Sequence, residues 1–310
     1  MRKCLLCNSN DTKIISSVAS RKIVQLYLEC YKSDFSYLFS DEEIKLIECT
    51  SCGLMFYIPQ VAGDEHFYAV LQKTNHYYRG NKEEYVFAAK NIKYGDDVLD
   101  VGCGKGEFKK FIQNCSFTGL EFSPDAIEAG TQDGCLILDQ SIEDHAKHYP
   151  QKYDVVTAFQ VLEHVTNVQS FIKSCADCVK PGGKLIIAVP SEDSYIRYST
   201  NSILNMPPHH ITRWTDTTLS NIADIIGFKL DVIYHDNLDN LHVESFFTDM
   251  VERSLRLKSP NRKLIDTSIT FKIRRKVANL ISKRIAKRCA NPAWFGKGQN
   301  VTAIYLKGGA

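Results

Sequence analysis

Residues 98–108 read Val-Leu-Asp-Val-Gly-Cys-Gly-Lys-Gly-Glu-Phe, an apolar run that ends in a glycine-rich turn. This pattern is typical of a buried strand that ends in a tight loop. Further short apolar runs follow at 117–122, 136–138, 153–159 and 185–189, with helical patterns between them. Strands that alternate with helices predict an α/β fold, a doubly wound domain around a mostly parallel sheet.

Local signals place several helix ends in this domain. Ser123-Pro124 predicts a helix start, because serine caps helices and proline suits the first helical position. A helical pattern from about 168 to 179 is expected to stop before Pro181-Gly182-Gly183. A last strand at 301–306 is expected to complete a seven-stranded sheet.

The glycine-rich loop lies between two acidic residues, Asp100 and Glu121, each at the end of a predicted strand. A carboxylate at the end of the second strand can accept both hydroxyls of a ribose. The loop lacks the dinucleotide spacing, because the third glycine comes early at Gly106, and no P-loop is present. Asp100 would repel a pyrophosphate and attract the cationic amino group of a methionine moiety. The charges therefore favour S-adenosylmethionine (SAM).

Four motifs resemble those of the class I SAM-dependent methyltransferases, in the family's order and spacing: 98–108, 119–123, 159–165 and 180–185. The resemblance covers about 96–235 plus the final strand and implies a Rossmann-like fold and SAM as cofactor. The residues that it implies around the cofactor are Asp100, Gly102, Cys103 and Gly104 at the methionine part, Glu121 at the ribose, Phe122, Ser141 and Ile142 at the adenine, and Gln160 under the methionine end. We interpret the Cys103 thiol as packing, not as a nucleophile.

Two Cys-x-x-Cys pairs, Cys4/Cys7 and Cys49/Cys52, stand near the N-terminus. Each pair can supply two thiolates to a tetrahedral zinc ion, and a closed four-thiolate site is structural. We therefore predict a small zinc ribbon, with hairpins between the pairs; Ile23 to Leu28 alternates in part like a strand. The alternative is four free core cysteines at coincidental spacing.

The remaining cysteines and the bulk composition indicate a soluble intracellular enzyme. Cys175 and Cys178 lie in a helical pattern without a second pair, so we expect helix packing. Eleven cysteines, no apolar leader after Met1 and no apolar run of membrane length predict a cytoplasmic protein. The net charge of +2 gives no reason to expect a nucleic-acid partner.

The segment 207–214, Pro-Pro-His-His-Ile-Thr-Arg-Trp, is the first candidate for acceptor chemistry. Methyl transfer to a hydroxyl needs a base, and histidine is the usual one near neutral pH. We expect His209 and His210 to face different ways, with His210 slightly favoured as the base. Arg213 is a candidate for an acceptor's phosphate or carboxylate, and Trp214 for stacking on a ring. Packing or helix capping is the alternative role.

A second candidate base is His164, which follows the fourth strand next to Glu163. A helix-cap or cofactor-pocket role is the alternative there. Tyr77, Tyr78 and Glu84 are candidates for a lid over the cofactor.

A zinc ribbon before this domain resembles bacterial methyltransferases that act on sugars in surface-polysaccharide pathways. We do not expect the large additional C-terminal domain of the sugar C-methyltransferases in this chain. The resemblance therefore implies a sugar or glycan acceptor, methylated on oxygen. The alternatives are an RNA methyltransferase and a non-catalytic zinc-ribbon interaction protein.

Residues 262–288 carry ten Lys or Arg and one acid, Asp266, with apolar residues at helical spacing. Such a basic amphipathic helix can lie on the anionic inner face of a membrane, or it can contact nucleic acid. The alternative is a helix packed on the domain with a solvated charged face. The predicted organisation is 1–58 zinc module, 59–95 aromatic helical linker or lid, 96–240 plus 300–307 SAM-binding domain, and 241–299 helical basic insertion.

Overall fold

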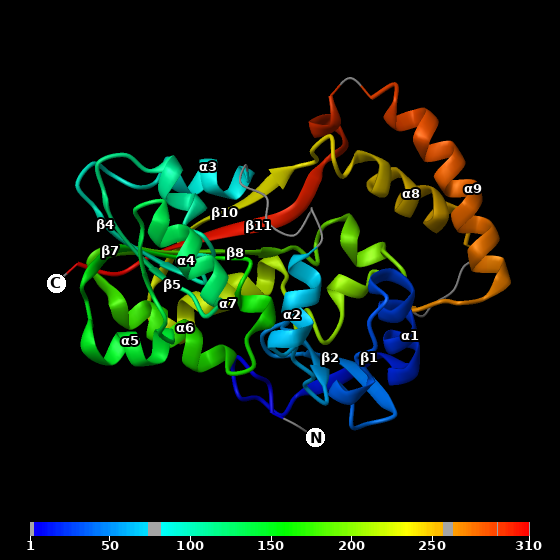
Figure 1. The fold of residues 1–310 in the computed structure, drawn as a ribbon, viewed down its shortest axis with the longest axis horizontal. Helices are drawn as coiled ribbons and strands as arrows, with labels where there is room; N and C mark the ends of the chain where they lie inside the picture. Colours follow the sequence, from blue (N-terminus) through cyan, green and yellow to red (C-terminus); the bar gives the residue numbers. More distant parts are fainter. Residues whose placement is uncertain (1–2, 74–81, 257–262, 290, 310) are drawn as a thin grey trace.

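The computed structural model describes residues 3–73, 82–256, 263–289 and 291–309. A seven-stranded sheet forms its centre, in the order β10-β11-β8-β7-β4-β5-β6 (Figure 1). Its strands are β4 (Asp97–Val101), β5 (Ser116–Leu120), β6 (Leu136–Leu138), β7 (Tyr153–Phe159), β8 (Val179–Pro190), β10 (Lys229–Asn237) and β11 (Lys297–Leu306). The five strands from β8 to β6 run parallel, and β11 runs antiparallel to both of its neighbours.

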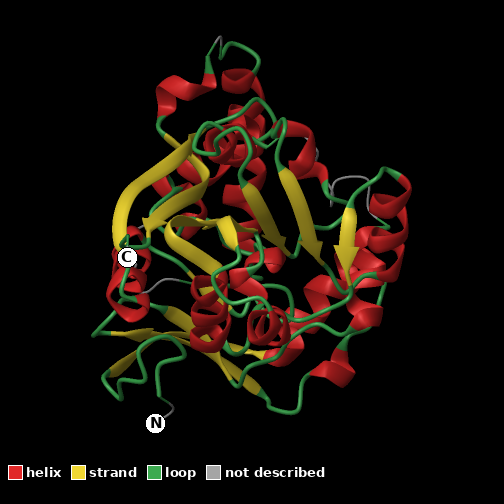
Figure 2. Cartoon of the chain, turned by 90° about the vertical axis from the view of Figure 1, so that its left-hand side faces the viewer, coloured by secondary structure: helices red, strands yellow, loops and turns green. Residues whose placement is uncertain are grey.

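Helices cover both faces of this sheet (Figure 2). Successive buried residues of each parallel strand point to opposite sides, so both faces are apolar and need a covering layer. Val98 packs on the face of α3 (Glu83–Ala89), η2 (Glu107–Phe111) and α4 (Pro124–Gln132). Leu99 packs on the face of α5 (Ile142–His148), α6 (Val168–Cys178) and α7 (Asp216–Ile226). The predicted doubly wound α/β fold is confirmed. Cys175 and Cys178 are fully buried packing residues on α6, as predicted.

Two local predictions differ from the structure. Strand β8 begins directly after α6, so Pro181-Gly182-Gly183 lies within the strand and not in a loop before it. Ile23 to Leu28 belongs to helix α1 (Ser20–Tyr31) and not to a strand. Ile23 and Tyr27, four residues apart, are both buried on one side of that helix.

A second, antiparallel sheet joins the N-terminal module to the rest of the chain, in the order β1-β2-β3-β9. Its strands are β1 (Thr12–Ala19), β2 (Glu43–Cys49), β3 (Met55–Ile58) and β9 (Thr212–Arg213). A core of its own forms beneath α1 and α2 (Glu65–Gln72), with η1 (Ser36–Leu38) beside them.

Strand β9 comes from the segment 207–214, far along the chain from its partner β3. Phe56 pairs with Thr212, and the Tyr57 amide donates to the Ile211 carbonyl at 3.0 Å. The Gly63 amide also donates to the Pro208 carbonyl at 3.0 Å. The N-terminal module therefore fixes the backbone that carries His209 and His210.

A helical hairpin lies between β10 and β11 and projects from the body in Figure 1. It consists of α8 (Val243–Ser254), α9 (Ile269–Ala286) and η6 (Pro292–Phe295). Short turns η3 (Leu162–His164), η4 (Tyr195–Tyr198) and η5 (Ile203–Asn205) follow β7 and β8. Among the helices of the described residues, none combines the length and apolar character required to cross a membrane.

Candidate active site

The glycine-rich loop turns at the carboxyl end of β4, the position at which open parallel sheets bind ligands. Gly102, Gly104 and Gly106 all have positive φ, at 70°, 55° and 75°. A Cβ on Gly102 would lie 2.4 Å from Val161 Cγ2. Glycine is therefore required at this point both by backbone angle and by space.

Asp100 lies buried at the end of β4, where its Oδ1 accepts from Thr157 Oγ1 at 2.7 Å. Burial raises the pKa of Asp100 to about 7, because an ionised carboxylate loses its hydration there. A cationic group of a bound cofactor would compensate for that loss. Asp100 thus fits the predicted contact with the amino group of SAM.

Glu121 follows β5, and backbone amides hold both of its carboxylate oxygens. Oε2 accepts from the Gly104 amide at 2.9 Å, and Oε1 accepts from the amides of Phe122 and Ser123 at 2.8 and 2.9 Å. The carboxylate is thereby fixed beside the glycine-rich loop, which suits recognition of ribose hydroxyls. The Phe122 side chain is 66% exposed and available to a flat ring.

The other predicted cofactor residues lie around the same edge of the sheet. Ser141 caps α5 by accepting from the Asp144 amide at 3.1 Å, and Ile142 is buried directly after it. Gln160 follows β7 with φ of 58°, and its buried Nε2 has no hydrogen-bond partner among the described residues. An unsatisfied buried donor fits a ligand that would complete it.

Cys103 packs against β5, because a Cβ on Gly119 would lie 2.3 Å from its Sγ. Burial raises the pKa of the Cys103 thiol, so it stays protonated and unreactive at neutral pH. This agrees with a packing role.

The three candidate bases, His164, His209 and His210, form one cluster, in which one nitrogen atom of each ring lies within 4.8 Å of those of the other two. The Nδ1 atom of each ring faces an oxygen atom. That of His164 lies 2.6 Å from the His209 carbonyl oxygen, and that of His209 lies 2.8 Å from the Leu204 carbonyl oxygen. That of His210 lies 3.3 Å from Oδ1 of Asn205. Each neutral ring therefore carries its proton on Nδ1, and its Nε2 keeps the lone pair.

Glu163 lies next to this histidine cluster and is 1% exposed. Its Oε1 is 3.8 Å from His164 Nε2 and 3.9 Å from His210 Nε2. Burial raises the pKa of Glu163 to about 8 and lowers the pKa of His164 to about 4 and that of His209 to about 3. Burial likewise lowers the pKa of His210 well below its usual value. The imidazoles are therefore neutral at pH 7, and each keeps an unprotonated ring nitrogen.

The rings of His209 and His210 are stacked, with centroids 4.5 Å apart and planes at 21°, so the expectation that they face different ways is wrong. Their two amides both donate to the Met206 carbonyl at 3.1 Å. This is a turn and not an extended segment, and a turn does not alternate neighbouring side chains.

Arg213 and Trp214 are not available to an acceptor, contrary to expectation. The Arg213 guanidinium is buried, with Nη1 3.3 Å from Glu192 Oε2 and Nη2 donating to the Tyr57 hydroxyl at 2.6 Å. Trp214 is fully buried and donates to Thr212 Oγ1 at 3.0 Å. Both hold the 207–214 segment against the core.

Three further residues complete the surroundings of the site. The Tyr68 hydroxyl lies 3.4 Å from His164 Nδ1. Glu84 is buried on α3, and Asp236 follows at the end of β10, where burial and the Glu84 charge raise its pKa to about 8. Sequence reasoning missed Asp236, although its position at a strand end was a usable signal. Tyr77 and Tyr78 lie outside the described residues.

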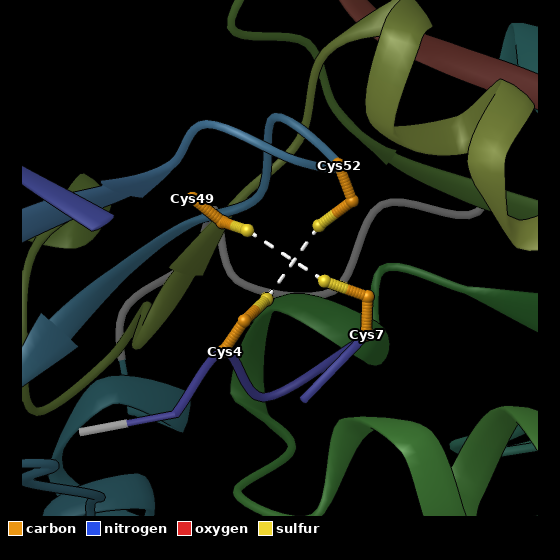
Figure 3. A group of neighbouring side chains, drawn as sticks. All are labelled: Cys4, Cys7, Cys49 and Cys52. Atoms are coloured by element: carbon orange, nitrogen blue, oxygen red, sulfur yellow. Dashed lines mark hydrogen bonds between the residues drawn. The ribbon is translucent and has the colours of Figure 1, made fainter. Parts of the chain in front are cut away.

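The four N-terminal cysteines converge from two knuckles (Figure 3). Cys4 Sγ lies 3.5 Å from Cys52 Sγ, and Cys7 Sγ lies 3.6 Å from Cys49 Sγ. Sulfur atoms around zinc, each at about 2.3 Å from the ion, stand roughly 3.8 Å apart in a tetrahedron. The donor set and spacing fit a structural zinc ion.

The family described as "Methyltransferase domain" matches residues 73–232. The chain therefore belongs to this family and is a class I SAM-dependent methyltransferase, as the motifs implied.

Among curated proteins, it is 30% identical over 164 residues to a ubiquinone biosynthesis O-methyltransferase of Proteus mirabilis, covering 45% of this chain and 67% of that protein. It is 38% identical over 114 residues to the protein of the same name from Vibrio atlanticus, covering 34% and 47%. Such matches span from 43% to 72% of the relatives' length. A solved SAM-dependent methyltransferase from Archaeoglobus fulgidus has a TM-score of 0.48 at 19% identity, over 79% of this chain and all of that one. These curated relatives carry names from ubiquinone biosynthesis, not from sugar methylation.

Proposed function

We propose that this protein transfers the methyl group of SAM to a hydroxyl of a sugar, in a nucleotide sugar or a surface polysaccharide. The acceptor oxygen would attack the methyl carbon, the carbon–sulfur bond would break, and S-adenosylhomocysteine would leave. The hydroxyl proton must then pass to a base. The observation that carries the proposal is the cluster of three neutral imidazoles, in which His164 follows Val161, whose side chain faces Gly102 of the glycine-rich loop.

Among the three histidines, the exposed fractions favour His164 as the base over His210, which the sequence favoured. The His164 side chain is 21% exposed and that of His210 is 11% exposed. His164 also lies in η3, which follows the end of β7 and Gln160. The backbone carbonyl of residue 209 would position His164, since it receives the His164 Nδ1 hydrogen bond.

Buried polar atoms near the histidine cluster support a polyhydroxylated acceptor. Oε2 of Glu163 has no hydrogen-bond partner among the described residues, whereas the carboxyls of Glu84 and Asp236 share a hydrogen bond. The charge of Glu84 raises the pKa of both Glu163 and Asp236, so the three carboxyls are neighbours. Buried carboxyl groups suit a ligand with several hydroxyls, because each new hydrogen bond removes a desolvation cost.

The test is methyl transfer from labelled SAM to nucleotide sugars and glycans, with wild type and His164→Gln, His209→Gln and His210→Gln. We expect His164→Gln to lose at least a hundredfold in kcat with SAM affinity unchanged. His148→Gln is the matched control, because His148 is an exposed histidine at the end of α5.

Full activity in all three variants would refute the base assignment. Activity that is lost on chelation and restored by a divalent metal, with the cysteine-bound zinc retained, would also refute it. A folded chain that binds no SAM would indicate a non-catalytic interaction protein instead.

A second candidate acceptor is the hydroxyl of a ubiquinone precursor. The curated relatives support it, since the Proteus and Vibrio proteins are named for O-methylation in ubiquinone biosynthesis. The same screen, extended to such phenolic compounds and to RNA, separates the three acceptor classes. Turnover of a phenol or of RNA without turnover of any sugar would contradict the sugar proposal. We also propose that Cys4, Cys7, Cys49 and Cys52 hold a structural zinc ion.

A further inference from the structure

Helix α9 has an inner face that packs on α8. Phe271, Ala278 and Ser282 are its buried residues. Arg274 Nε donates to Glu252 Oε1 at 3.0 Å, and Arg275 pairs with Asp249, whose side chain is also buried. These contacts determine which side of α9 faces away from the protein.

The outer face of α9 is apolar and exposed. Its exposed apolar side chains are Ile269 (75%), Ile273 (59%), Val277 (41%), Leu280 (57%) and Ile281 (37%). Their spacings of three and four residues place them in one stripe along the helix. An isolated exposed leucine needs no explanation, whereas a continuous apolar stripe on an outward helix does.

Basic residues border this stripe. Lys272, Lys276, Lys283 and Lys287 are exposed and follow one line along the helix, and Arg284 and Arg288 are exposed farther along it. Residues 269–286 contain no Asp or Glu. The outer face therefore combines an apolar stripe with a wholly cationic border, the pattern of helices that lie in a membrane interface.

We propose that the outer face of α9 docks on an anionic lipid surface. The apolar side chains would enter the headgroup region, while the lysines contact lipid phosphates. Trp294, 79% exposed in η6 just beyond α9, is a further interfacial anchor. A second copy of this chain is a poorer occupant, because a symmetric contact would bring two cationic rows together. RNA would use the lysines but has no use for an aliphatic stripe.

This docking would bring the methyltransferase site to the surface. The hairpin packs on η4 through Tyr195 and Phe247, and η4 follows the carboxyl end of β8. The cofactor loop lies at that same end of the sheet. The protein would thus reach acceptors at the lipid surface without a spanning helix. The inference does not depend on the acceptor being a sugar.

The test is co-sedimentation of the full chain with vesicles of phosphatidylcholine, with and without phosphatidylglycerol, at low and high salt. We expect at least tenfold stronger binding to the anionic vesicles, reduced by salt. Ile273→Ser/Leu280→Ser should lower that binding at least tenfold, and Lys276→Glu/Lys283→Glu at least as much. Ile14→Ser/Leu136→Ser is the matched control, since those side chains are 62% and 57% exposed elsewhere and should bind like wild type.

SAM affinity is measured on every variant, and a wild-type value shows that the fold is intact. Membrane binding is thereby tested separately from the methyltransferase reaction. Equal binding to neutral and anionic vesicles, or undiminished binding of the serine variant, would overturn the proposal. So would a dimer in light scattering that only the serine variant dissociates. RNA binding lost in the glutamate variant but kept in the serine variant, without vesicle binding, would assign the surface to nucleic acid instead.

Discussion

The affinity for SAM should depend steeply on pH because of Asp100. Burial raises the pKa of Asp100 to about 7 from an ordinary 3.8, a difference of about 3 units that corresponds to roughly 4 kcal/mol. Only the ionised carboxylate attracts the cationic amino group of SAM. At pH 5 about one molecule in a hundred carries that charge, so the affinity should fall about 100-fold, or ~2.7 kcal/mol, between pH 8 and pH 5.

The same shift has a definite sign for the stability of the unliganded protein. The folded state keeps a proton on Asp100 that the unfolded chain releases above pH 4. The contribution of this group to stability therefore falls as the pH rises from about 4 to about 7, and SAM should restore it. The stabilisation by SAM in thermal unfolding should be larger at pH 8 than at pH 5.

Isothermal titration of SAM between pH 5 and 8, in buffers of different ionisation enthalpy, measures both the affinity and the protons released. Asp100→Asn should bind weakly at pH 8 and lose most of the pH dependence. Thr157→Val removes the hydroxyl that donates to Asp100 Oδ1 at 2.7 Å and should move the midpoint to higher pH. A constant affinity from pH 5 to 8 in folded wild type, without proton release, would refute the reasoning.

Three other predictions concern the metal, the loop and the hairpin. Cys52→Ser should lower bound zinc from one ion per chain to none and lower the melting temperature. It should also reduce kcat more than SAM affinity, because the N-terminal module supports the 207–214 segment. An unchanged zinc content would refute the four-thiolate site. Gly102→Ala should abolish SAM binding in a folded chain. The control is Gly95→Ala, because Gly95 has a φ of 86° but open space around it; this variant should lose only about 1–2 kcal/mol of stability and keep SAM binding. Equal effects of the two substitutions on SAM binding would contradict the steric argument. Glu252→Gln should lower stability by about 1–3 kcal/mol and expose α9 to proteolysis, since the buried Glu252 carboxylate pairs with both Arg256 and Arg274. Proteolysis of this variant at the wild-type rate would contradict the prediction.

Local signals in the sequence were sufficient for the sheet and the cofactor loop. Strand β7 occupies residues 153–159 and β6 residues 136–138, as their apolar runs predict. The positive φ of Gly102 and the Ser-Pro start of α4 depend only on adjacent residues, so they can be read from a few letters. The two Cys-x-x-Cys pairs identified in the same way the four cysteines whose sulfur atoms converge.

The acceptor side was decided by contacts between distant segments. Arg213 has the sequence context of an exposed loop cation, yet Tyr57, Glu192 and Asn205 enclose it. The pairing of β3 with β9 turns the 207–214 segment inward and brings His209 and His210 to His164. By itself the sequence determined the α/β sheet, the glycine-rich loop and the set of four N-terminal cysteines, because backbone angles, periodicity and motif spacing are local. Only the tertiary structure decided which histidines meet and which charges are buried, because partners far apart along the chain set those distances.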